Sequence, residues 1–187
     1  MGNMSNINIS HHLLKRWTIL HSYTHYFMID TPNLANFKSI SHEVTGYSLK
    51  NLESIVSADI HFVSEYNYLQ ADATALFRGI CNVRSLVLSA TSLMALTDTR
   101  GFRKFSALCQ QKVPCCLLYK LKTIKITNFT DEKDRIGKAE YILKNGGALQ
   151  KLTIRTGLYI SEEEKLEIYQ VLLASPRKSN QCRILFI

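Results

Sequence analysis

The chain has 187 residues, of which 46% are hydrophobic, 20% charged and 10% aromatic. These proportions are typical of a globular domain with its own core, and they exclude disorder, collagen and small disulfide scaffolds. The net charge of +8 is evenly spread: residues 1–120 hold 11 Lys and Arg against 7 Asp and Glu, and residues 121–187 hold 12 against 8. Because no basic tail or cluster stands out, a solvated, mildly basic surface is favoured over a nucleic-acid site.

The start of the chain and its cysteines bear on its compartment. No apolar run approaches the roughly 18 residues of a membrane span, and MGNMSNINISHH lacks the order of a signal peptide. We therefore expect a soluble cytoplasmic or nuclear protein, without membrane association, whose five cysteines are reduced thiols. Cys115 and Cys116 are adjacent and no CxxC pair exists, so neither a metal site nor another cofactor is predicted.

Short strands with apolar first, fourth and sixth residues are predicted along the chain. Clear versions are LKRWTI, VRSLVL, LKTIKI and LQKLTI, and looser ones lie between the first two; the starts are Leu14, Leu34, Ile55, Val83, Leu121 and Leu149. Roughly six or seven such matches are expected by chance, so the intervening segments must support the pattern. Before VRSLVL, an apolar face that includes Leu76, Phe77 and Ile80 predicts a helix, and TSLMAL after it predicts a further short one.

The last third gives the strongest support. After LKTIKI, apolar residues at helical spacing and a closing Gly146–Gly147 pair predict a helix of about three turns. A second helix follows LQKLTI: Ser161 and Glu164 form a capping box, and Pro176 stops it. Its apolar stripe is expected at Leu166, Tyr169, Leu172 and Leu173, and CRILFI is a terminal strand.

The spacing of the strands favours a repeat architecture. Strand, helix, strand, helix, strand with short loops is typical of a parallel sheet. The starts are 20, 21, 28, 38 and 28 residues apart, mostly in or near the leucine-rich-repeat range of about 20–29. The interval of 38 residues is too long and indicates a decayed or lost repeat.

Particular phrases carry a family resemblance. LKTIKI, YILKNGGALQKLTI and LLASPR, followed by a terminal strand with a cysteine, resemble in order and spacing the FBD region that closes plant F-box/FBD/leucine-rich-repeat proteins. Upstream, IDTPNLANFKSI, YSLKNLESIVSADI and ATALFRGICNVRSLVLSATSLMAL resemble the irregular repeats that precede it. The resemblance covers about Leu14 to Ile187.

The resemblance implies an α/β fold: a leucine-rich-repeat-like arc or partial solenoid ending in a βαβαβ FBD unit. We expect a flexible N-terminus over residues 1–13, irregular repeats over 14–120 and an FBD domain over 121–187. The implied function is a protein interaction module like the substrate-recognition region of an SCF-type E3 ubiquitin ligase, which binds a protein substrate and is not an enzyme.

Two departures from the family leave alternatives open. Nothing in MGNMSNINISHHLLKR resembles an F-box, so binding to the SCF adaptor is not expected. TDTRGFRKFSALCQQK bridges a point where the family usually has more repeat sequence. The alternatives are a free-standing LRR/FBD binding protein, a truncated gene product without a ligase role and, weakest, a weak nucleic-acid binder.

Motifs for catalysis are absent, and the remaining candidate is a binding surface. GxGxxG, GxxxxGK, HExxH and GxSxG do not occur. His21 and His25 are expected on one strand face, too far apart to share a metal, and Glu162–Glu164 are explained by a helix N-terminus. In the repeat strands the residues flanking the fourth position should share a concave face, either a surface for acidic ligands or an ordinary solvated face; they are Arg16, Thr18, Ser85, Val87, Thr123, Lys125, Lys151, Thr153 and Arg155.

Overall fold

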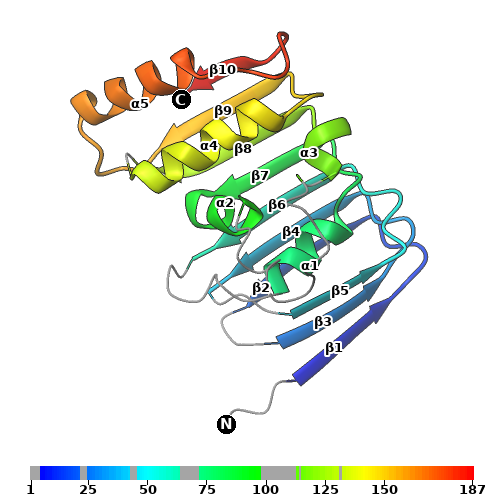
Figure 1. The fold of residues 1–187 in the computed structure, drawn as a ribbon. Helices are drawn as coiled ribbons and strands as arrows, with labels where there is room; N and C mark the ends of the chain where they lie inside the picture. Colours follow the sequence, from blue (N-terminus) through cyan, green and yellow to red (C-terminus); the bar gives the residue numbers. More distant parts are fainter. Residues whose placement is uncertain are drawn as a thin grey trace, which may run out of the picture.

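Six strands come first along the chain, and from residue 72 onward helices and strands follow one another (Figure 1). The computed structural model describes residues 5–21, 25–42, 46–63, 72–97, 113, 115–130 and 132–187. The strands are β1 (Ser5–Ser10), β2 (Arg16–His21), β3 (His25–Asp30), β4 (Asn36–Ser41), β5 (Gly46–Lys50), β6 (Ser57–Phe62), β7 (Ser85–Ser89), β8 (Thr123–Phe129), β9 (Lys151–Thr156) and β10 (Arg183–Phe186). The helices are α1 (Asp72–Gly79), α2 (Ala90–Thr97), α3 (Cys115–Tyr119), α4 (Lys133–Asn145) and α5 (Glu162–Ala174).

The strands form two sheets in which every pairing is parallel. Seven strands follow the order β10-β9-β8-β7-β6-β4-β2, and three follow the order β1-β3-β5. In the first third of the chain, consecutive strands therefore alternate between the two sheets, whereas helices connect the later strands. The predicted α/β class with a parallel sheet is confirmed.

A strand is present at each of the six predicted positions, but it begins later than predicted. The strands β2, β4, β6, β7, β8 and β9 each begin two residues after the predicted apolar start. The starts from Leu34 to Leu149 are buried, because the chain turns inward there before the strand begins. The three-stranded sheet was not predicted, since SNINIS and GYSLK hold too few apolar residues to match the strand pattern.

The core changes its composition along the molecule. At the N-terminal end, aromatic rings join the two sheets: Trp17 and Phe37 of the larger sheet contact Phe27 and Tyr47 of the smaller one. Toward the C-terminus, helices α2, α4 and α5 take the place of the second sheet (Figure 1). Aliphatic side chains such as Leu88, Ile126 and Ile154 are fully buried in this part.

Helices α4 and α5 confirm most of the predicted pattern. Helix α4 ends at Asn145 with Gly146 as its C-cap, and α5 ends before Pro176. The apolar stripe predicted for α5 is wrong in two places, because Leu166 and Leu173 are 56% and 54% exposed. Only one narrow side of α5 is buried, with Ile168 and Leu172 inward and the Tyr169 ring against Phe186 of β10, 3.8 Å between centroids.

The structure also bears on the expectations for the two histidines and for the bridging segment. His21 and His25 do not share a strand: His21 ends β2 in the larger sheet, and His25 begins β3 in the smaller one. Segment TDTRGFRKFSALCQQK lies outside the described residues except for its first threonine. Among the described residues, no helix is long and apolar enough to cross a membrane.

The cap of α5 gives a direct test of the helix start. The Ser161 hydroxyl accepts a hydrogen bond from the Glu164 amide, and the Glu164 carboxylate accepts one from the Ser161 amide. Ser161→Ala should lower the free energy of unfolding by about 1 kcal/mol, because one helix N–H loses its acceptor. Urea denaturation would measure the change, with Ser179→Ala outside the helix as the control. An unchanged midpoint would show that the cap contributes nothing.

Candidate interaction surface

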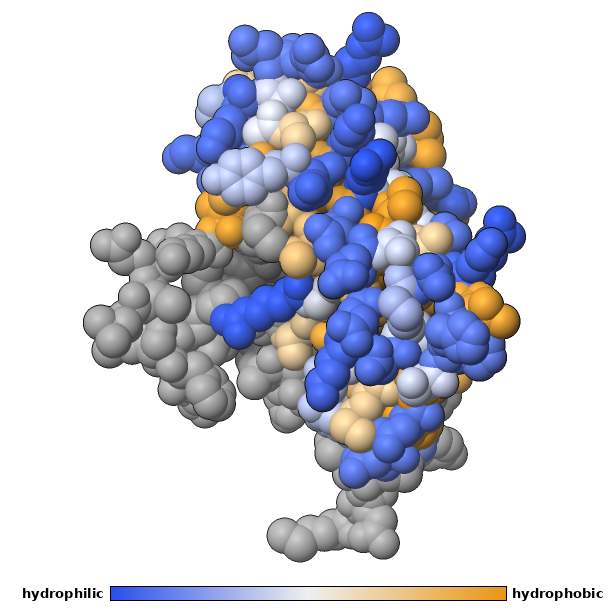
Figure 2. All heavy atoms as spheres, turned by 90° about the vertical axis from the view of Figure 1, so that its right-hand side faces the viewer, coloured by the Kyte–Doolittle hydropathy of each residue, from blue (hydrophilic) through white to orange (hydrophobic). Residues whose placement is uncertain are grey.

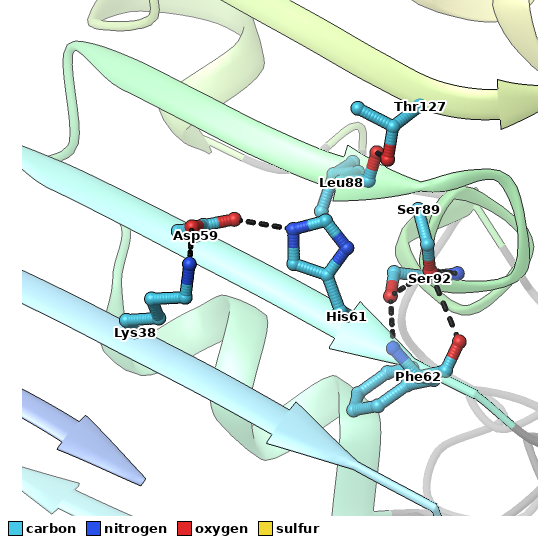
Figure 3. Close-up of polar contacts among 8 residues, drawn as sticks. All are labelled: Lys38, Asp59, His61, Phe62, Leu88, Ser89, Ser92 and Thr127. Atoms are coloured by element: carbon cyan, nitrogen blue, oxygen red, sulfur yellow. Dashed lines mark hydrogen bonds and ion pairs between the residues drawn. The ribbon is translucent and has the colours of Figure 1, made fainter. Parts of the chain in front are cut away.

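The outward side chains of the seven-stranded sheet form one continuous surface, here called the open face. Inward residues of each strand point to the helices and the smaller sheet, and the alternate residues point away from them. In the close-up of Figure 3 the helices lie behind the sheet, and the polar side chains of β4 and β6 stand in front of it. In the described part of the chain, no helix or strand packs on this face.

The nine residues predicted for a shared surface lie on the open face. Cross-strand register aligns Ser85, Thr123 and Lys151 in a first row and Val87, Lys125 and Thr153 in a second. Arg16 and Thr18 extend these rows through β4 and β6 to β2, and Arg155 follows Thr153 on β9. Most are exposed or half-buried, but Thr153 is buried. The role of these residues in binding stays a prediction.

The sequence reasoning missed the open-face residues of three strands. They lie on β4, β6 and β10: Asn36, Lys38, Ile40, Ser57, Asp59, His61, Arg183 and Leu185. All but Ile40 and His61 complete the same two rows, and these two pair with each other further along β4 and β6. The signal was present, since the looser starts at Leu34 and Ile55 have the same two-residue offset to a strand, and the predicted terminal strand CRILFI contains β10. The same alternation would have placed these side chains outward.

A charged cluster lies at the centre of the open face (Figure 3). The Asp59 carboxylate accepts from Lys38 Nζ at 2.8 Å through Oδ2 and contacts His61 Nε2 at 2.6 Å through Oδ1. Burial alone would raise the pKa of the Asp59 carboxyl, but hydrogen bonds from His61 and Lys38 outweigh it and hold the pKa below its ordinary value. Lys38 on β4 and His61 on β6 therefore compensate the negative charge of the Asp59 carboxylate.

Short hydrogen bonds fix the strands that carry this surface. Ser57 donates to Asn36 at 2.6 Å and Thr123 to Ser85 at 3.0 Å, each across neighbouring strands of the open face. At the end of β6, the Ser92 hydroxyl accepts from the Phe62 amide at 2.8 Å (Figure 3). These contacts connect neighbouring strands of the open face and tie the end of β6 to α2.

The Asp59 cluster predicts a pH-dependent contribution to stability. With the native pKa below the unfolded value, the cluster stabilises the fold above about pH 4, and the gain is lost as the pH falls through the native pKa. Asp59→Asn should lower the free energy of unfolding by about 1 kcal/mol at pH 7. The difference in free energy of unfolding between Asp59→Asn and the wild type should disappear near pH 2. Asp134→Asn is the control. A difference that is constant with pH would contradict this account.

The side chains of the open face are of types that make non-covalent contacts. Among the described residues, no group of three His, Cys, Asp or Glu side chains could hold a metal ion. Burial raises the pKa of the Cys182 thiol, which keeps it protonated and unreactive at neutral pH. The arrangement of cations, hydroxyls and an exposed Leu185 is suited to contact with another macromolecule.

Comparisons with known proteins agree with these features. A family model described as FBD matches residues 110–154, which include β8, α4 and the start of β9. An F-box/LRR-repeat protein of Arabidopsis thaliana is 36% identical over 51% of this chain and 26% of its own length. An FBD-associated F-box protein of the same plant is 25% identical over 98% of the chain and 32% of its length. An F-box/FBD/LRR-repeat protein is 28% identical over 73% and 32%.

These findings define the class of protein and the proteins that it resembles. The chain is an α/β protein of parallel strands with a segment that matches the FBD model. It is similar to plant F-box/FBD/LRR-repeat proteins, so the predicted resemblance is confirmed. The chain spans 26% to 32% of the length of these relatives. No solved structure matches it.

Proposed function

We propose that this chain is a protein interaction module that recognises a protein substrate through the open face of its seven-stranded sheet. The observation that carries the proposal is the common register, which brings outward side chains from seven strands into unbroken rows. A broad, fixed surface of this kind suits a protein partner better than a small ligand.

The proposal includes a leucine-rich-repeat type of architecture. Its support is the constant two-residue offset between each apolar start and its strand, over intervals of 20, 21, 28, 38 and 28 residues. Repeats of this kind bury their apolar residues against their neighbours and leave the outer side of the strands for binding. The FBD-matching segment continues the same sheet through β8 and β9.

The relatives suggest the wider role. Proteins with F-box in their names resemble the recognition components of SCF-type ubiquitin ligases, and we propose that this segment corresponds to the part that holds the substrate. The role is recruitment in the cytoplasm or nucleus, with no catalytic step in this chain.

Site-specific photo-crosslinking tests the location of the interface. A crosslinking amino acid would replace Thr18 or Lys125 on the open face, or Glu163 or Glu167 on the exposed part of α5 as matched controls. In extract from Arabidopsis seedlings, the two open-face positions should trap the same protein and the α5 positions should not. Equal trapping at all four positions, or trapping from α5 alone, would contradict the proposal.

A fusion experiment tests substrate recognition. The F-box segment of one relative would be fused to the chain, and the trapped protein would be followed in plant cells. Proteasome-dependent loss of that protein, absent with the unfused chain, is the expected result. Stable binding without loss would favour a free-standing binding protein.

A further inference from the structure

Cations gather on the C-terminal half of the open face and at the edge where its strands begin. Lys125 stands in the second row on β8, and Lys151 and Arg183 are paired in the first row on β9 and β10. Arg84 and Lys122 lie one residue before β7 and β8, joined by a backbone hydrogen bond of 2.8 Å from the Lys122 amide to the Arg84 carbonyl. We call these five residues the cationic strip.

The cationic strip is available to a ligand. Arg84, Lys122, Lys151 and Arg183 are exposed, and Lys125 is half-buried. Within the described part of the chain, none of the five forms an ion pair. Figure 2 views the edge at which the strands of the larger sheet begin, and hydrophilic residues dominate its described surface.

No acidic side chain opposes the strip from its own strands. The outward residues of β7 to β10 are cations, hydroxyl residues, Val87 and Leu185. The nearest acid in the rows is Asp59 on β6, and Val87 separates it from Lys125 in the register. Both Asp59 oxygens are occupied by Lys38 and His61 (Figure 3), so the strip keeps its positive charge.

The helical layer behind the sheet carries charges of both signs. Helix α5 opens with Glu162, Glu163 and Glu164, whereas α4 carries Asp134 and Glu140 beside Lys133, Arg135, Lys138 and Lys144. On the outward side of β7 to β10, by contrast, cations lie with no acid among them. A local excess of positive charge of this kind steers an anionic partner toward the open face.

We propose that the cationic strip binds an acidic, extended polypeptide segment of the protein substrate that runs across strands β7 to β10. The inference rests on the proposed function, because it names the partner of the same open face. Four strands at a spacing of about 4.8 Å span about 14 Å, which corresponds to about four or five residues of extended chain. The Leu185 side chain, 42% exposed at the end of the second row, adds an apolar contact beside the charges.

Fluorescence anisotropy with defined probes tests the inference on the full chain. The probe is a labelled eight-residue peptide of alternating Glu and Ser, with alternating Gln and Ser as the neutral control. The wild-type chain should bind the acidic probe, with affinity that falls as salt rises, and should bind the neutral probe at least tenfold more weakly.

Two charge-matched variants locate the binding. K122E/K151E removes two cations of the strip and should weaken binding at least tenfold. K133E/K144E makes the same change of net charge on α4, behind the sheet, at opposite ends of the helix, and should alter binding less than twofold. Circular dichroism would confirm that both variants remain folded. An equal loss in the two variants would overturn the inference, since attraction to net charge would explain it.

The remaining outcomes separate this inference from the proposed function. If the acidic probe does not bind but Thr18 and Lys125 still trap a protein, the inference is overturned and the proposed interaction function is still supported. Tighter binding of a single-stranded oligonucleotide of equal charge, lost in K122E/K151E, would overturn it in favour of nucleic acid. Probe binding without trapping would support the strip and contradict the proposed substrate role.

Discussion

Phe129→Ala should lower the free energy of unfolding by about 3–5 kcal/mol, the usual cost of removing a fully buried ring from a core. The Phe129 side chain is 0% exposed. It reaches the core through an irregularity in β8: Asn128 takes a positive φ of 55° and the register shifts between Ile126 and Phe129. Regular alternation would have turned Asn128 inward and Phe129 outward.

Chemical denaturation would measure the loss. Tyr159→Ala is the matched control, because Tyr159 is 99% exposed and its ring contributes nothing to the core. The control should change the free energy of unfolding by less than about 0.5 kcal/mol. A small loss for Phe129→Ala would mean that neighbouring side chains collapse into the space.

A fragment of residues 121–187 should lack cooperative unfolding. The cut removes β7, which pairs with β8 from Ser85↔Thr123 to Ser89↔Thr127. It also removes α2 and α3, which pack on α4, and so exposes fully buried side chains such as Ile126 and Ala139. A repeat-like unit that buries its apolar residues against its neighbour cannot form its core alone.

Differential scanning calorimetry of the fragment beside the whole chain would check this. The whole chain should give a heat-absorption peak and the fragment a broad, featureless trace. A sharp transition in the fragment would show that the predicted FBD domain folds as an autonomous unit, and the boundary at residue 121 would then be a true domain boundary.

Local patterns in the sequence predicted the C-terminal elements well. The capping box at Ser161, the closing Gly146 and the stop before Pro176 all act within a few residues, so their signals are readable from the sequence. The two-residue offset of the strands is equally local. The N-terminal sheet was missed because β1 and β5 depend on pairing with β3, and β5 also on the packing of Phe37 from the larger sheet against Tyr47.

The sequence predicted which residues lie on the open face better than it predicted their contacts. Successive residues of a strand point to opposite sides of the sheet, so the residues of the face can be read from the sequence, and the predicted residues do lie together. The charged cluster depends on which strands are neighbours: Lys38 and Asp59 are 21 residues apart and meet through the pairing of β4 with β6. The gathering of cations on the outward side of β8 to β10 likewise needs three-dimensional placement, since the net charge of both parts of the chain is the same.

The unequal spacing of the strands has a consequence for how such proteins diversify. Intervals of 20 and 38 residues lead to the same pairing register, so the length of a connecting segment is independent of the alignment of the sheet. A lineage can lengthen or shorten one connection and leave the rows of the open face in line. Outward residues can then change one at a time, because their neighbours keep their positions. This combination lets new partners be acquired by substitution at the surface while the buried framework is inherited intact.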